Sequence, residues 1–82
     1  MSATAVQSDA IWLNASNYNV SPLNAGLAHR VPELKHALQG GIAAFPDTGR
    51  NDFYDVELAQ GRAYIHIHDD KHTVYLVAYS RL

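Results

Sequence analysis

The chain contains no cysteine, which excludes disulfide cross-links, thiolate metal sites and thiol-based catalysis. It also lacks any apolar run near the roughly 20 residues that a membrane-spanning helix needs. The first residues have neither the basic nor the apolar segment of a secretion signal. We therefore expect a cytoplasmic protein that makes no contact with a membrane.

Basic residues are few, because six Lys and Arg stand against eight Asp and Glu, for a formal net charge of −2. Nucleic-acid-binding proteins usually gather basic residues into a patch that neutralises phosphates, whereas here they are scattered. The sequence also has no glycine-rich phosphate loop, no paired-carboxylate motif and no nucleophile beside a base. Composition thus disfavours nucleic acid as a partner, and we predict no catalytic residue and no cofactor.

The length and composition suit one small α+β domain. The 82 residues are 48% apolar, enough to supply a core, although a domain of this size buries only roughly 60% of the surface that its unfolded chain exposes. Residues 1–9 are small and polar, which predicts a flexible N-terminus. The domain is therefore expected to span residues 10–82.

Three segments near the C-terminus alternate apolar and polar residues with a period of two: residues 53–58, 62–68 and 73–79. This period is typical of strands with one buried face. Short turn-like segments separate them, so we predict a three-stranded antiparallel meander. A short apolar run at residues 10–15 predicts a further, N-terminal strand.

A helical segment is predicted before the meander. Ser21-Pro22 is a good start, since serine caps free N–H groups and proline fits the first helical position. Pro32 predicts a kink or break, and Gly40-Gly41 predicts the end. One apolar stripe follows at helical spacing, and we expect it to pack on the sheet: Leu23, Leu27, Val31, Leu34 and Leu38.

The register predicts what each face of the meander displays. A turn at Gln60-Gly61 pairs Val56 with Ile65, and the second hairpin pairs His68 with Thr73. The face toward the helix is then apolar and runs from Tyr54 to Ala78. The opposite face, called the open face below, is expected to display Phe53, Asp55, Glu57, Tyr64, His66, His68, Thr73, Tyr75, Val77 and Tyr79. One cross-strand row on it joins Asp55, His66 and Tyr75.

Such an aromatic open face indicates a protein partner, because aromatic residues dominate interaction hot spots. We predict a small interaction module, acting as a regulator, adaptor or inhibitor, or a homodimer formed through this face or the edge of the last strand. In the alternative, Trp12 or a terminal segment covers the face and its role is structural. The predicted partner-binding residues are Asp55, Glu57, Tyr64, His66, His68, Tyr75 and Tyr79.

The histidines leave a second function open. His66, His68 and His72 lie within seven residues, and the first two point the same way from one strand, which suits a metal site if a third ligand such as Asp55 completes it. His-x-His alone is an unspecific signal, equally typical of a polar strand face. We predict no metal site, with a histidine-based metal-binding protein as the alternative.

Residues 61–81 resemble the C-terminal strands of RelE/ParE-type toxins: a glycine, a strand with arginine and tyrosine, an acidic turn, and a strand ending near an arginine. The predicted order of a strand, a helical segment and a three-stranded meander is also similar to their architecture. The resemblance covers about residues 53–82. It implies an alternative function as a toxin or ribonuclease, in which Arg62, Tyr79 and Arg81 correspond to RNA-contacting positions.

The chain departs from that family in its charge. Asp55 and Glu57 are expected on the open face, where carboxylates repel phosphates. Because a fold does not determine a function, a binding protein on the same scaffold suits this charge better than a ribonuclease.

Overall fold

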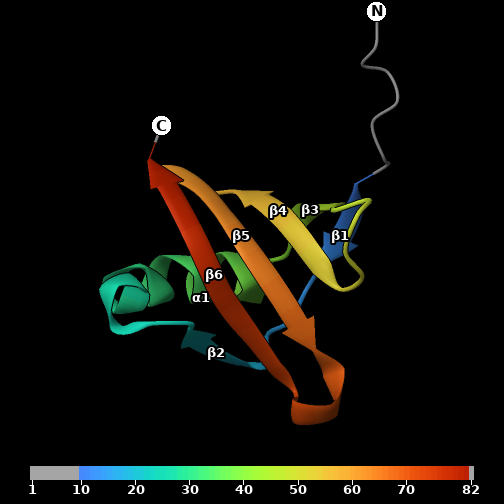
Figure 1. Cartoon of the computed structure of the whole chain (residues 1–82), viewed down its shortest axis with the longest axis horizontal. Helices are drawn as coiled ribbons and strands as arrows, with labels where there is room; N and C mark the ends of the chain where they lie inside the picture. Colours follow the sequence, from blue (N-terminus) through green and yellow to red (C-terminus); the bar gives the residue numbers. More distant parts are fainter. Residues whose placement is uncertain (1–9, 82) are drawn as a thin grey trace, which may run out of the picture.

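One six-stranded sheet and one helical segment of sixteen residues make up the described part of the computed structural model, residues 10–81 (Figure 1). The strands are β1 (Ile11–Leu13), β2 (Asn19–Pro22), β3 (Ile42–Pro46), β4 (Phe53–Glu57), β5 (Gly61–His68) and β6 (Thr73–Arg81). They lie in the order β1-β3-β4-β5-β6-β2, with β2 parallel to β6 and the other pairs antiparallel. The predicted α+β class is confirmed, whereas the predicted flexible segment 1–9 lies outside the described residues.

The sheet is larger than the predicted meander because two strands carry little local signal. β3 reads Ile-Ala-Ala-Phe-Pro and does not alternate apolar and polar residues, whereas β2 reads Asn-Val-Ser-Pro and alternates over only four residues. β2 tolerates Pro22 because it is an edge strand, paired on one side with β6. The predicted helix start at Ser21-Pro22 is therefore wrong, while the predicted N-terminal strand is confirmed as β1.

The helical segment begins as the 3₁₀-helix η2 (Ala25–Arg30) and continues as α1 (Val31–Gly40). The Asn24 side chain caps it by accepting a hydrogen bond of 3.0 Å from the Gly26 N–H. Pro32 lies in the first turn of α1, at the change from 3₁₀ to α geometry, which confirms the predicted break. Gly41 follows with a φ of 88° and ends the helix as predicted. No helix within residues 10–81 is long and apolar enough to cross a membrane.

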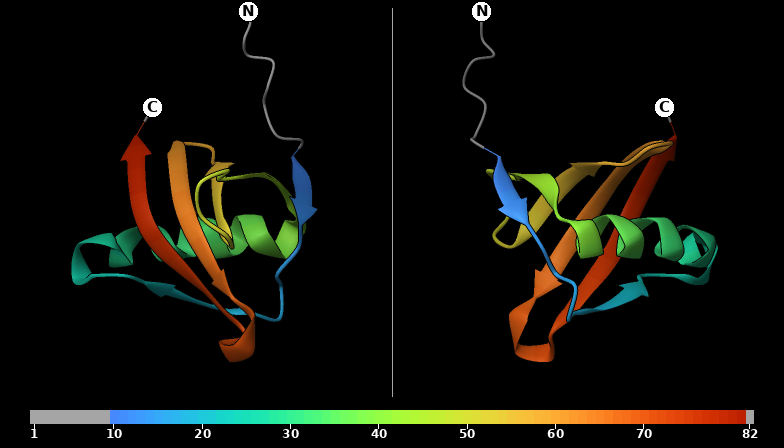
Figure 2. Two further views of the ribbon diagram at one scale, coloured as in Figure 1. Left: turned by 45° about the vertical axis from the view of Figure 1, so that its right-hand side comes forward. Right: turned by 180° about the vertical axis from the view of Figure 1, so that it is seen from behind.

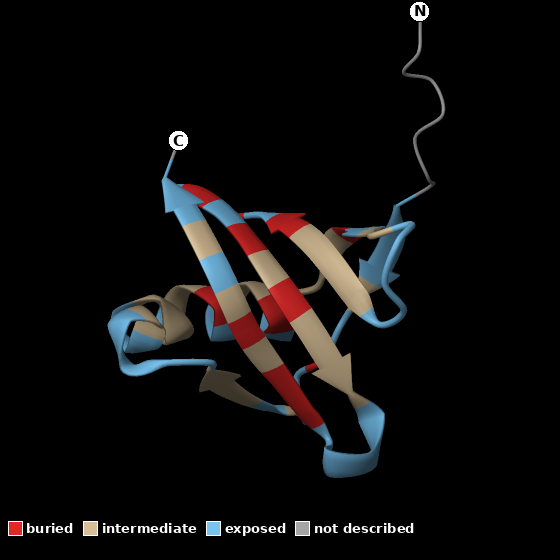
Figure 3. Cartoon of the chain, viewed as in Figure 1, coloured by how far each residue is buried: buried red, intermediate tan, exposed pale blue. Residues whose placement is uncertain are grey.

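α1 covers one face of the sheet, as both views in Figure 2 show. Leu34 and Leu38 are 0% and 1% exposed and pack against the apolar side chains of the central strands. Buried and less buried positions alternate along β5 and β6 (Figure 3). Leu23 was predicted on the same helical stripe, but it precedes the helix and is 59% exposed.

The strand register keeps the predicted faces but changes the rows across them. The second hairpin pairs His68 with Thr73, as predicted. The first pairs Val56 with Ala63 rather than with Ile65, because Gly61 already belongs to β5. A shift of two residues leaves the side chains of β4 and β5 on their predicted faces.

The shift nevertheless overturns the predicted row of Asp55, His66 and Tyr75. His66 lies opposite Phe53 on one side and Tyr75 on the other. Asp55 lies opposite Tyr64 instead.

A β-bulge in β6 also moves one predicted residue off the open face. Ile65 pairs with Leu76 while the preceding Tyr64 pairs with Ala78, so Val77 is an extra residue in β6. Beyond the bulge the alternation inverts: Ala78 is exposed, and Tyr79 lies opposite the buried Ala63. The prediction that Tyr79 faces away from the helix is therefore wrong.

Candidate interaction surface

A row of three rings crosses the centre of the open face. Phe53 on β4, His66 on β5 and Tyr75 on β6 face one another across the strands. The Phe53 and His66 rings stack with centroids 4.3 Å apart and an angle of 2°, while those of His66 and Tyr75 are 6.2 Å apart. The Arg50 guanidinium lies 3.8 Å from the centroid of the Phe53 ring, a cation–π contact. These contacts hold the rings in place on rigid strands.

The loop between β3 and β4 is tied down onto this face. The Tyr64 hydroxyl donates a hydrogen bond to Asp47, and the Gly49 N–H donates another of 2.9 Å to the same carboxylate. The bond from Tyr64 is the main reason that the pKa of Asp47 is lowered, and it raises the pKa of Tyr64 above 10. The loop ends at Asp52, which has a positive φ of 67° and accepts a 2.9 Å hydrogen bond from the Ile67 N–H through its carbonyl.

A shallow groove lies beside the row of rings. We call it the apolar groove; it encloses about 250 Å³ and is lined by Leu23, Arg50, Phe53, His66, Tyr75 and Val77. Leu23 forms one wall because its N–H donates a 2.8 Å hydrogen bond to the Leu76 carbonyl, which leads the chain away from β2 beside β6. Its apolar walls and single guanidinium suit one apolar side chain of a ligand.

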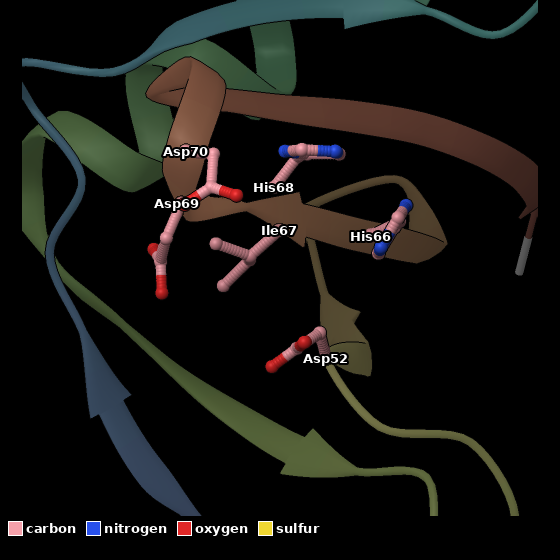
Figure 4. A pocket seen from close by; sticks show the side chains of 6 residues that line it. All are labelled: Asp52, His66, Ile67, His68, Asp69 and Asp70. Atoms are coloured by element: carbon pink, nitrogen blue, oxygen red, sulfur yellow. The ribbon is translucent and has the colours of Figure 1, made fainter.

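A second hollow, the acidic pocket, begins on the other side of His66 (Figure 4). It encloses about 430 Å³ and is lined by Asp52, His66, Ile67, His68, Asp69 and Asp70. Asp69 and Asp70 come from η3 (Asp69–Lys71), the short turn between β5 and β6. His66 lines both hollows, so the apolar groove and the acidic pocket adjoin at this side chain.

Of the predicted partner-binding residues, all but Tyr79 lie on the open face, and His66, His68 and Tyr75 line the two hollows. His66 and His68 are near each other, with ring centroids 5.9 Å apart. Glu57 pairs with Arg62 at 3.2 Å, both side chains being more than half exposed, so the ion pair adds little stability. Asp55 is half-buried beside Tyr64.

Tyr79 belongs to a separate cluster on the helix side. Its hydroxyl donates a 3.1 Å hydrogen bond to Glu33, and the Arg30 guanidinium lies 4.4 Å from its ring centroid. Burial, followed by the hydrogen bond to Glu33, raises the pKa of Tyr79. This tyrosine joins the helix to the sheet and does not line the open face.

The sequence reasoning missed several apolar contributors to the surface. Phe45 lies opposite Asp55 and is 39% exposed. Trp12 lies opposite Ala43, on the same side of β3 as Phe45, and is 71% exposed. Trp12 therefore extends the surface at its β1 edge and does not cover the central rings. These positions were concealed because β3 was not predicted as a strand.

The arrangement also bears on the alternative functions. Within residues 10–81, no three His, Asp or Glu side chains are grouped closely enough to hold a metal ion. The residues that the toxin resemblance singled out do not share a face, because Arg62 lies opposite Ser80 on the open face while Tyr79 and Arg81 lie beyond the bulge on the helix side.

No family model, curated protein or solved structure matches the chain.

Proposed function

We propose that this chain is a small protein–protein interaction module, a regulator, adaptor or inhibitor, whose contact surface is the open face of the sheet. The observation that carries the proposal is the collection of exposed apolar groups on one side. Leu23 and Phe45 are 59% and 39% exposed on this side, and Trp12 is 71% exposed at its edge. Trp12 and Phe45 lie on the neighbouring strands β1 and β3, Leu23 lies beside β6, and the row of rings lies between them; exposed apolar surface of this kind marks sites of association.

The central rings have the properties of interaction anchors. Phe53, His66 and Tyr75 are stacked on adjacent strands, so binding orders them little further. The surrounding rim is charged, with Arg62 and Glu57 at one end and Asp52 at the other. An aromatic centre inside a polar rim is typical of protein interfaces.

A comparison of variants on the two faces tests this proposal. Tagged wild type, Tyr75→Ala, Phe45→Ala and Tyr79→Phe would be used to capture proteins from the native host. We expect wild type and Tyr79→Phe to retain the same partner, and the two open-face variants to lose it. Equal capture by all four folded proteins, or capture by none, would refute the proposed surface.

A second copy of the chain is also a candidate partner. β2 pairs only with Thr73–Leu76, so within the described residues the outer edge of β6 from Val77 to Arg81 has no neighbouring strand. Such an edge pairs readily with another strand. Light scattering distinguishes a monomer of 9.0 kDa from a dimer of twice that mass. Arg81 lies opposite Gly61, whose carbonyl faces β4, so the Arg81 N–H points to the outer edge and Arg81→Pro should weaken a dimer of this kind.

A further inference from the structure

We infer that the partner presents a basic segment, which places an apolar side chain in the apolar groove and Lys or Arg side chains against the acidic pocket. This inference rests on the proposed function and adds the chemistry of the partner. It follows from the adjacency of two unlike hollows, because His66 lines both of them. A single extended segment can therefore occupy both at once.

The carboxylates of the acidic pocket have no basic partner in the described chain. The side-chain ion pairs within residues 10–81 are Arg30–Glu33 and Arg62–Glu57. Asp52, Asp69 and Asp70 thus form no side-chain ion pair, and the nearby Lys71 of η3 supplies a single positive charge beside their carboxylates. Asp69 accepts a 2.8 Å hydrogen bond from the neutral Tyr18 hydroxyl, which leaves its charge uncompensated.

The cations on the open face are already engaged. Arg62 lies 3.2 Å from Glu57. Arg50 stacks on Phe53, and its charge acts on the nearby Asp47 carboxylate, whose pKa it helps to lower. The surplus charge around the two hollows is therefore negative, which attracts a basic segment and repels an acidic one or a phosphate backbone.

The apolar groove indicates which side chain the segment presents beside its basic residues. Leu23, Phe53, Tyr75 and Val77 form its walls, and its volume of about 250 Å³ suits one large apolar side chain. The predicted segment is thus amphipathic, with an aromatic or leucine anchor next to basic residues.

The probe for this inference is a random peptide library displayed on phage, panned against the immobilised protein. Bound phage would be compared with those recovered on Tyr75→Ala, which removes one wall of the groove. We expect the enriched peptides that depend on Tyr75 to combine Lys or Arg with an aromatic or leucine residue. A synthetic peptide of the enriched sequence would then be titrated in low and in high salt.

The charge contribution is measured with the double variant Asp52→Asn/Asp70→Asn. Asparagine tolerates the positive φ at Asp52, so this variant should fold normally. Loss of two peripheral charges should weaken the peptide about five- to tenfold at low salt and flatten its salt dependence. The control protein carries Lys35→Gln and Gln39→Glu in addition to the double variant. These exposed positions of α1 lie away from the open face, so the two substitutions restore the net charge of the protein without restoring the charge of the acidic pocket.

Each outcome separates the inference from the proposed function. Enriched peptides that are acidic or neutral yet depend on Tyr75 overturn the basic partner and leave the interaction surface intact. Unchanged affinity in Asp52→Asn/Asp70→Asn, or recovery of affinity in the control with restored net charge, also overturns the acidic pocket as the contact. Absence of any Tyr75-dependent peptide overturns the surface itself.

Discussion

Replacing Gly61 by alanine tests the packing that turns Tyr79 toward the helix. A Cβ atom at Gly61 would meet the Ser80 carbonyl oxygen first, and it would also lie 2.7 Å from both Cζ and the hydroxyl oxygen of Tyr79. Ordinary contacts between such atoms are about 3.5–4.0 Å, so either the ring or the strand must move. Overpacking of this kind costs about 1–3 kcal/mol.

That cost is large for a chain of 82 residues, whose total free energy of unfolding is expected to be roughly 4–12 kcal/mol. We therefore expect Gly61→Ala to lower the Tm by roughly 5–20 °C. Thermal unfolding followed by circular dichroism, together with urea unfolding, measures both quantities.

A double-mutant cycle identifies Tyr79 as the cause. In a Tyr79→Ala background the ring contact is absent and only the contact with the Ser80 carbonyl remains. The cost of Gly61→Ala should then fall, with a coupling energy of about 0.5–3 kcal/mol. A cost for Gly61→Ala below about 0.5 kcal/mol would refute the close packing over Gly61, and an equal cost in both backgrounds would refute the contribution of the Tyr79 ring.

Three further predictions concern the helix end, the loop and the core. Gly40→Ala should be neutral or stabilise the fold by about 0.4–1 kcal/mol, because a Cβ there meets nothing within 4 Å, whereas Gly41→Ala should destabilise it at a φ of 88°; urea unfolding of the two variants decides. Asp47→Asn should bring the raised pKa of Tyr64 back toward 10, seen in the ultraviolet absorbance of tyrosinate. The lowered pKa of Asp47 means that its ionised form stabilises the fold above pH 3.8 and that this contribution disappears as the pH falls through the lowered pKa. The free energy of unfolding of Asp47→Asn should therefore lack this part of the pH dependence in acid. Leu38→Ala, at a position 1% exposed, should cost about 2–5 kcal/mol in urea unfolding; a cost below about 1 kcal/mol would contradict the described core.

The sequence predicted the elements that depend on local patterns. Period-two alternation identified β4, β5 and β6, and Pro32 and Gly41 predicted the break and the end of the helix. β3 was missed because its sequence does not alternate, and β2 because it is only four residues long and its Ser21-Pro22 also suits a helix start; tertiary pairing rather than local preference makes them strands.

The faces were more predictable than the rows. Burial distinguishes a slip of one residue, which inverts the faces, but not a slip of two, which keeps them. For this reason the sequence placed Asp55 beside His66, whereas the structure places Phe53 there. The bulge at Val77 brings the Tyr79 ring over Gly61, an arrangement that alternation alone does not encode.

Of the candidate surface, the sequence identified the residues of the central strands and missed those supplied by loops and edges. Leu23, Arg50 and Phe45 reach the open face through tertiary structure. Leu23 belongs to the predicted helical segment, and the other two lie between that segment and the predicted meander.

Site-specific photo-crosslinking in the native host tests the central claim most directly. A photoreactive phenylalanine analogue would replace Phe45 on the open face in one protein and His36, exposed on α1, in another. We predict a covalent adduct to a partner from position 45 and none from position 36. Adducts from position 36 alone, or from neither position, would contradict the assignment of the open face as the interaction surface.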